Sequence, residues 1–259
     1  MARPVAIQSR GNPLLVRLRR LLDDPSAHRK HGQIVIEGEH LCAAWLASDR
    51  GPVLQALVSE AGWERPAVRE LAVKADAVAV VSAAAMAGVT ALGSPAAILF
   101  VVPLPEASTV LRGAASVVLD RVQDPGNVGS ILRSAAAFGF GQAIALKGTA
   151  ALWSPKVVRA GMGAHFRLRL VDAVEAESLD ALDLPLLGTS SHVGERIDRA
   201  EIPWPCAWVF GHEGQGLSAH VQGRCAQMLC IAQPGGEESL NVAAAAAVCL
   251  HESARRRAG

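Results

Sequence analysis

The stretch that decides the fold of this 259-residue chain spans residues 116–133 and reads SVVLDRVQDPGNVGSILR. Its first five residues form an apolar run that predicts a buried strand ending at Asp120. Asp124-Pro125-Gly126 predicts a tight turn, because these residue types favour turns. Asn127 is a residue type that caps helices, so we expect a helix over 128–138 that carries Arg133 within its first two turns. Polar residues beyond the carboxyl end of a strand are where open α/β sheets bind ligands.

Two further polar loops follow predicted strands in the same half of the chain. Residues 210–216 read FGHEGQG, and the three glycines predict a tightly bent backbone whose exposed N–H groups can cradle an anion or an adenosine. The spacing G-x-x-G-x-G differs from the fingerprints of dinucleotide-binding and P-loop proteins. Residues 231–241 read IAQPGGEESLN, where Ser239 is a candidate N-cap and Asn241 offers an amide and a carbonyl to a ligand. The three loops together indicate a small-ligand site in the C-terminal half.

Strand and helix patterns alternate along the chain, which predicts mainly parallel sheets covered by helices. Pro103-Leu104-Pro105 interrupts the alternation and is typical of a linker. We therefore expect an α/β protein with domains at residues 1–105 and 106–259. The expected strands are 33–37, 53–58, 77–81, 97–102, 116–120, 143–146, 168–171, 185–188, 207–210 and 228–231. The expected helices are one from Pro13, then 40–47, 66–74, 83–88, 128–138, 155–161 and 176–182, a short one after Ser218 and a last one from Leu240.

Composition excludes several classes of protein. With 51% apolar residues and a net charge of +1, the chain does not fit intrinsic disorder. It has no run of about 18 apolar residues that could cross a membrane, and its N-terminus lacks the apolar segment of a secretory signal. The five cysteines form no C-x-x-C pair, so we expect a reduced cytoplasmic protein without a metal site.

Charge is concentrated at the N-terminus. Residues 1–31 carry seven basic and two acidic side chains, a net charge of +5. A basic edge of this kind can be an electrostatic footprint for nucleic acid, and it can equally be a solvated helix face.

Read in order, the three loops resemble the motifs of the SpoU–TrmH family of RNA ribose 2′-O-methyltransferases, in the SPOUT superfamily. The matching segments are Asn127–Arg133, Gly211–Ser218 and Ser239–Ala243, and residues 154–163 resemble the family's connecting segment. The resemblance implies a C-terminal SPOUT domain with a mainly parallel sheet and a C-terminal trefoil knot. It also implies a small N-terminal α/β domain of the L30e type, bound S-adenosylmethionine, and a homodimer that completes the site.

The resemblance further implies roles for single residues. The cofactor would be held, chiefly through backbone groups, by Thr189, Gly211, Ile231 and Leu240. The catalytic positions would be Asn127, Arg133, Glu213, Ser239 and Asn241. Arg133 would act either as the base for the ribose hydroxyl or, because a guanidinium stays protonated, as a ligand for phosphate and for developing alkoxide charge. The chain departs from the family at Ala232-Gln233, where Pro-Met is frequent, and at His212, where a small hydrophobe is frequent.

RNA is the expected partner, and ribosomal RNA of the 23S type is favoured over transfer RNA by the L30e-type domain. The RNA-binding residues would be Arg10, Arg17, Arg20, Arg29 and Lys30, which would contact phosphate and read shape. A transfer RNA 2′-O-methyltransferase stays open as an alternative, and so do two other functions. An RNA-binding paralogue without catalysis is disfavoured by the presence of Asn127 and Arg133. A dinucleotide-dependent oxidoreductase is disfavoured by the missing G-x-G-x-x-G motif.

Overall fold

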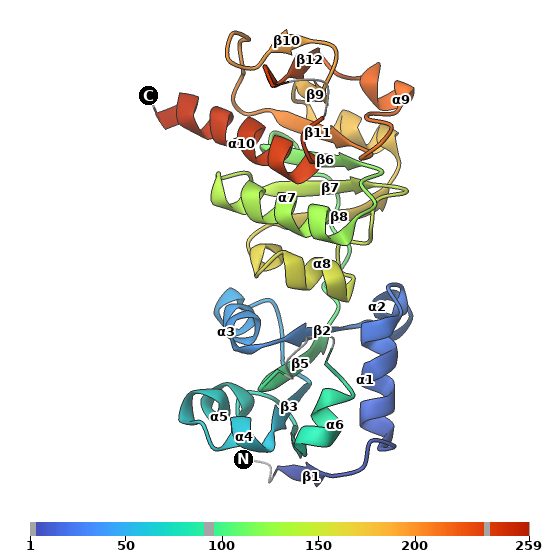
Figure 1. Cartoon of the computed structure of the whole chain (residues 1–259), viewed down its shortest axis with the longest axis vertical. Coiled ribbons are helices and arrows are strands. Elements are labelled where there is room, and N and C mark those ends of the chain that lie inside the picture. The colour runs from blue at the N-terminus through green and yellow to red at the C-terminus, as the bar shows by residue number, and fades with distance from the viewer. Residues whose placement is uncertain (1–3, 91–95, 236–238, 259) are drawn as a thin grey trace. The chain divides into compact units, whose positions relative to one another are not determined.

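The structure, a computed structural model, describes residues 4–90, 96–235 and 239–258. The chain forms two compact units (Figure 1), one made of residues 1–106 with 153–166 and the other of residues 107–152 with 167–259. The first unit thus takes up a segment from the second half of the sequence, whereas the expected division at 105/106 is a single cut. In the described part of the chain, no helix is long and apolar enough to span a membrane.

The first unit is built on a five-stranded mixed sheet in the order β1-β4-β3-β5-β2. Its strands are β1 (Val5–Ile7), β2 (Gln33–Glu37), β3 (Gln55–Ser59), β4 (Val78–Val81) and β5 (Ile98–Pro103). Its helices are α1 (Pro13–Asp23), α2 (Ala27–His31), α3 (Glu39–Ser48), α4 (Glu60–Trp63), α5 (Pro66–Ala72), α6 (Ala83–Ala87), α8 (Pro155–Ala160) and the 3-10 turn η1 (Ala164–Phe166). The expectation of a mainly parallel sheet is wrong for this unit, because β5 runs antiparallel to both β3 and β2.

Helix α1 shows how the sequence builds this unit. Asn12 accepts a hydrogen bond from the Leu14 backbone N–H at 2.9 Å, and proline occupies the first helical position. The leucines at 15, 18 and 21 then fall on one buried face and pack with the apolar side chains of β2, β3 and β5. α8 packs against β2 within the same unit, where the Arg159 guanidinium lies 3.7 Å from the Glu37 carboxylate.

The second unit contains a seven-stranded sheet in the order β10-β12-β9-β11-β6-β7-β8. Every pairing between its described strands is parallel, so the expectation of a mainly parallel sheet is confirmed here. The strands are β6 (Ser116–Asp120), β7 (Gln142–Leu146), β8 (Arg169–Val174), β9 (Leu186–Ser190), β10 (Glu195–Arg196), β11 (Ala207–Gly211) and β12 (Gln227–Cys230). The helical segments are α7 (Pro125–Ala137), the 3-10 helix η2 (Ala176–Leu182), α9 (Ala219–Gln222) and α10 (Val242–Ala258).

Burial explains why the central strands of this sheet are mostly apolar. Every residue of β6, β7 and β11 is buried, as expected for parallel strands covered on both faces. Figure 1 shows α7 and α10 lying side by side over the sheet, and the two helices are in contact. The buried Trp208 indole N–H donates to the Ser253 hydroxyl at 2.8 Å, which ties α10 to β11.

Register brings the three polar loops to one edge of this sheet. β11 pairs with β6 so that Gly211 lies opposite Asp120, and both strands end there. β9 flanks β11 on the other side, and β12 flanks β9. Because all four strands run in the same direction, the loops that follow them leave the same edge of the sheet.

Candidate active site

The loop after β6 places Asn127 inside the first turn of α7. The Asp124 carboxylate accepts a hydrogen bond from the Asn127 backbone N–H at 2.8 Å, so Asp124 caps the helix. The expectation that Asn127 is the cap is therefore wrong. Pro125 accounts for the difference, because proline needs no hydrogen-bond partner at the first helical position and starts the helix directly after Asp124. The Asn127 side chain is consequently free to reach the neighbouring loop.

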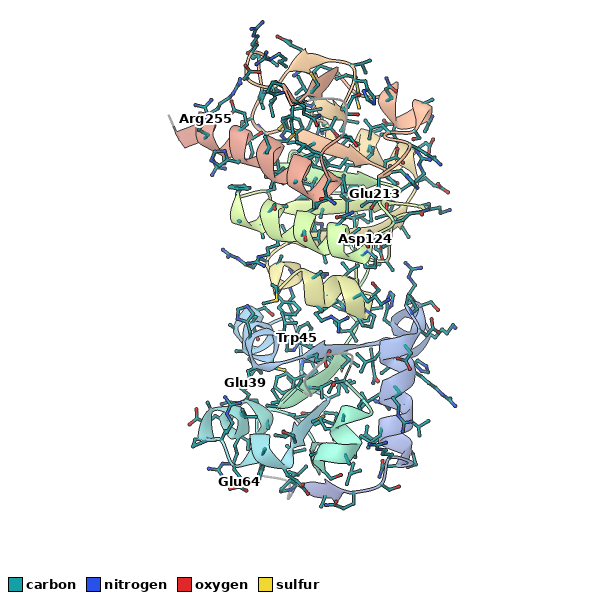
Figure 2. The ribbon with its side chains drawn as sticks, in the orientation of Figure 1. Glu39, Trp45, Glu64, Asp124, Glu213 and Arg255 are labelled. Carbon is teal, nitrogen blue, oxygen red and sulfur yellow. The ribbon has the colours of Figure 1, made fainter. Side chains whose placement is uncertain are left out.

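Glu213 connects the glycine-rich loop to this helix start. Its carboxylate accepts hydrogen bonds from the backbone N–H groups of Gln123 at 3.2 Å and Asp124 at 3.1 Å, and from the Asn127 amide at 3.1 Å. Figure 2 shows Asp124 and Glu213 where the two loops meet. Partial burial raises the pKa of Glu213, but these hydrogen bonds outweigh burial and hold the pKa below its usual value. Glu213 is therefore an anion that organises the start of α7.

Asn241 extends this contact into the third loop. Its amide nitrogen donates to the Asn127 side-chain oxygen at 3.0 Å, while its own oxygen accepts the backbone N–H groups of Ala243 and Ala244. Asn241 thus caps α10, and the expectation that Ser239 does so is wrong because the helix begins only at residue 242. Donation runs in one direction, from Asn241 to Asn127 to Glu213, which fixes the orientation of both amides. We call these three side chains the polar relay.

The glycine-rich loop is closed by its own histidine. The His212 Nδ1 atom accepts the backbone N–H groups of Gly214 at 3.0 Å and Gln215 at 3.3 Å, and the backbones of His212 and Gly216 exchange two hydrogen bonds. The N–H groups of residues 214–216 are therefore used inside the loop, and the expectation that they are exposed to cradle an anion is wrong. A Cβ atom at Gly211 would collide with the backbone of Gly216 and Leu217, so the loop folds directly onto the end of β11.

A cavity of about 330 Å³ lies at this edge of the sheet. Its volume falls in the range of small-molecule sites. Its described lining includes all four positions expected to hold a cofactor, which are Thr189, Gly211, Ile231 and Leu240. Glu213 of the polar relay and Ser239 also line the cavity. The Thr189 hydroxyl donates to the Val209 carbonyl at 2.9 Å, so it is committed to the sheet. Residues 236–238, part of the third loop, lie outside the described residues.

Residues 114–251 match the profile of the SpoU rRNA Methylase family. The chain belongs to this family. It is 35% identical over 163 residues to the 23S rRNA (guanosine-2′-O-)-methyltransferase RlmB of Bordetella pertussis, covering 61% of this chain and 66% of that protein, just under two thirds. It is 31% identical over 226 residues to the 23S rRNA (guanosine(2553)-2′-O)-methyltransferase RlmP of Bacillus subtilis, covering 86% of this chain and 88% of that protein.

A solved structure gives the same result. The SpoU methyltransferase AviRb from Streptomyces viridochromogenes, in complex with the cofactor AdoMet, superposes with a TM-score of 0.84 at 25% identity, covering 96% of this chain and 99% of that chain. The resemblance to SpoU–TrmH enzymes inferred from the three motifs is confirmed. The SpoU match contains all three loops of the site.

Arg133 stands apart from the other expected catalytic residues of this SpoU domain. Its side chain is exposed on α7 and makes no hydrogen bond or ion pair with any residue that the structure describes. Nor is it among the described residues that line the cavity. The structure therefore brings together Asn127, Glu213 and Asn241, places Ser239 on the cavity, and leaves the Arg133 guanidinium unpaired within the described chain.

Sequence reasoning missed two residues that support the site. Asp120 is almost fully buried, and its carboxylate accepts the Ser218 backbone N–H at 2.6 Å. A carboxylate that closes an otherwise apolar strand was a usable signal for this role. The Arg121 side chain donates hydrogen bonds to Gln215 and Gly216 of the glycine-rich loop, and no local sequence pattern predicts those contacts.

The expected RNA-binding residues all belong to the first unit of this SpoU-family chain and are exposed there: Arg10, Arg17, Arg20, Arg29 and Lys30. Several also have partners within the unit. Arg10 donates to the Ala84 carbonyl at 2.9 Å, Arg17 to the Gln33 side chain at 2.9 Å, and Lys30 pairs with Asp24 at 3.1 Å. Four of the five cations are on α1 or α2, Arg10 precedes α1, and all five are exposed to solvent.

Burial suppresses the reactivity of three of the five thiols. All five cysteines are free, and burial is the main cause that raises the pKa of Cys206 and Cys249 to about 12 and of Cys225 to about 11. Such thiols are inert at neutral pH. Among the described residues, no group of three or more His, Cys, Asp or Glu side chains is placed to hold a metal ion.

Proposed function

We propose that this chain transfers a methyl group from S-adenosylmethionine to a ribose 2′-hydroxyl of ribosomal RNA, of the 23S type. The observation that carries the proposal is the cavity at the carboxyl edge of the parallel sheet in a SpoU-family chain. Its lining holds the four expected cofactor positions, and the polar relay borders it through Glu213. The relatives named as 23S rRNA 2′-O-methyltransferases and the AdoMet complex of AviRb support the choice of reaction and cofactor.

The cavity suits S-adenosylmethionine in size and chemistry. Leu217, Met228, Ile231 and Leu240 offer apolar contacts for an adenine ring, among polar groups from the loops. Gly211 lets the glycine-rich loop lie directly on the strand end, where any Cβ would push the loop away. When bound, S-adenosylmethionine supplies an electrophilic methyl group on its sulfonium sulfur.

The residues of this chain would position the two reactants and stabilise the charge that develops during the transfer. The polar relay holds the first turn of α7 against the glycine-rich loop, which fixes the helix that carries Arg133. The unpaired Arg133 guanidinium would bind an RNA phosphate and stabilise the charge that develops on the ribose oxygen. Ser239 and Asn241 would shape the third loop around both ligands. Correct placement of the two reactants accounts for much of the rate of such a displacement.

A second copy of the chain would complete the site. Within one chain, Arg133 is not among the described lining residues of the cavity and its side chain has no described hydrogen-bond or ion-pair partner, so we expect a homodimer in which it serves the cavity of the partner subunit. The resemblance to SPOUT proteins also supports a trefoil knot that brings the third loop beside the second. The five free thiols support a reducing compartment such as the cytoplasm.

The first unit would bind the RNA substrate as an L30e-type domain. Its exposed cations on α1 and α2 can contact phosphates, and the sheet of parallel and antiparallel strands that supports those helices holds the cations in place. A separate RNA-binding domain of the L30e type favours ribosomal RNA as substrate over transfer RNA.

The test is methyl transfer from tritiated S-adenosylmethionine to unmodified 23S rRNA, with a tRNA transcript as the comparison substrate. We expect label in rRNA and, after alkaline hydrolysis, in a dinucleotide that resists cleavage because its 2′-oxygen is methylated. Label in a base, or label only in tRNA, would contradict the proposed substrate or atom. Binding of both cofactor and RNA without transfer to either RNA would instead identify a catalytically silent RNA-binding paralogue.

A further inference from the structure

Arg121 adopts a backbone conformation that L-residues rarely use. Its φ angle is 62°, in the left-handed region, at the first position after β6. The Thr149 hydroxyl holds it there by accepting the Arg121 backbone N–H at 3.0 Å while donating to the Leu119 carbonyl at 2.9 Å. Glycine would take this conformation without steric strain, whereas arginine adopts it here and places a long cationic side chain at the end of β6.

The side chain reaches across to the glycine-rich loop. Its Nη1 donates to the Gln215 side-chain oxygen at 3.0 Å and its Nη2 to the Gly216 carbonyl at 3.3 Å, while its Nε lies 3.3 Å from the Asp120 carboxylate. Asp120 in turn accepts the Ser218 backbone N–H at 2.6 Å. Arg121 and Asp120 therefore hold the loop at three points, residues 215, 216 and 218.

The contacted residues border the cavity, whereas Arg121 is not among its described lining residues. Gln215 and Gly216 both line the cavity, together with His212, Glu213, Gly214 and Leu217 of the same loop. We call residues 212–217 the cavity lip. The His212 acceptor closes the lip from within, and the Arg121 guanidinium fixes it from outside to the end of β6.

We propose that Arg121 is a positioning residue, which holds the cavity lip in its ligand-binding conformation through Gln215 and Gly216 and thereby sets the affinity for S-adenosylmethionine. The identity of the ligand rests on the proposed function, whereas the fixing of the lip does not. If arginine were only tolerated at this position, replacing it by a residue that fits the same φ angle would leave the lip unchanged.

The test compares Arg121→Gly, Arg121→Asn and Arg121→Lys in the full-length chain. Glycine and asparagine fit the left-handed conformation but remove the guanidinium. We expect both variants to raise the Kd for S-adenosylhomocysteine about tenfold, because two hydrogen bonds from a charged donor are lost at a partly exposed site. We expect amide hydrogen exchange of the lip in the ligand-free chain to accelerate by a similar factor. Lysine keeps the charge and should recover part of both properties.

Asp49→Gly is the matched control, since Asp49 also has a left-handed φ angle, of 52°, but ends α3 in the first unit. It should change neither the Kd nor exchange at the lip. Unchanged lip exchange and Kd in Arg121→Gly and Arg121→Asn would overturn the proposal, as would failure of both to fold, which would make the role structural. If the wild-type chain binds no S-adenosylhomocysteine and the Arg121 variants still show faster amide exchange at the lip, the result would support positioning by Arg121 and contradict the proposed cofactor.

Discussion

Replacing Glu213 by glutamine tests whether the anion at the centre of the polar relay organises the site. One Glu213 oxygen accepts two donors, from Asp124 and Asn127, and the other accepts the backbone N–H of Gln123. Glutamine keeps the shape but has only one accepting oxygen. If that oxygen serves the two donors, the amide nitrogen must face the Gln123 N–H, so one hydrogen bond is lost and two donors oppose each other.

The expected cost follows from those bonds. Hydrogen bonds to a charged acceptor contribute about 1.5–3 kcal/mol, but Glu213 is exposed to solvent, which reduces their net value. We expect Glu213→Gln to lower the free energy of unfolding by about 1 kcal/mol at pH 7. For a protein of this size, that is a fall of about 2–4 °C in Tm.

The stability difference should depend on pH. The hydrogen bonds hold the pKa of Glu213 in the folded chain below its ordinary value of 4.5, so the carboxylate contributes stability above pH 4.5. That contribution is lost as pH falls through the folded-state pKa. Since Glu213→Gln cannot titrate, wild type and variant should converge below about pH 4.5.

Urea denaturation of both proteins from about pH 3 to pH 8 measures this difference. Glu195→Gln is the control, because the Glu195 side chain is exposed on β10 and makes no hydrogen bond or ion pair within the described chain. It should shift the unfolding free energy by less than about 0.5 kcal/mol at every pH. A Glu213→Gln difference that is absent at pH 7, or that does not shrink toward low pH, would refute the reasoning.

Three further perturbations test other parts of the site. Gly211→Ala should weaken S-adenosylhomocysteine binding more than about thirtyfold by calorimetry, because its Cβ would collide with the lip backbone. At Gly214 a Cβ would only touch the His212 ring at 3.9 Å, an ordinary contact, so Gly214→Ala should stay within about threefold, and equal effects would contradict the steric argument. Arg133→Ala should reduce methyl transfer at least about a hundredfold with Tm and cofactor Kd unchanged, and surviving turnover would show that Arg133 is not catalytic. Removing Arg17 and Arg20 together should reduce the slope of log RNA affinity against log salt by about 1–2 and spare cofactor binding; an unchanged slope would exclude phosphate contacts by α1.

Periodicity and burial made much of the fold predictable. β6 and β2 have the expected bounds, because each is an apolar run that the sheet buries. The antiparallel placement of β5 was not predictable, since its residues are apolar whichever direction it runs. The seven residues of η2 follow the expected pattern but wind as a 3-10 helix, which side-chain periodicity over so short a segment does not distinguish from an α-helix.

The site was predictable as three loops, and its internal contacts were not. Asp124 and Asn127 are both good capping residues, and only the position of Pro125 decides which one caps α7. Asn127 and Asn241 are 114 residues apart, so no local pattern reports their hydrogen bond. Arg121 could not be assigned a role because its contacts depend on β11 lying beside β6.

Calorimetric titration of the purified chain with S-adenosylhomocysteine tests the central claim most directly. The account predicts micromolar binding at about one site per chain, and loss of that binding in Gly211→Ala. A folded wild-type sample that binds no S-adenosylhomocysteine, or whose binding survives Gly211→Ala unchanged, would contradict the assignment of this cavity as the cofactor site.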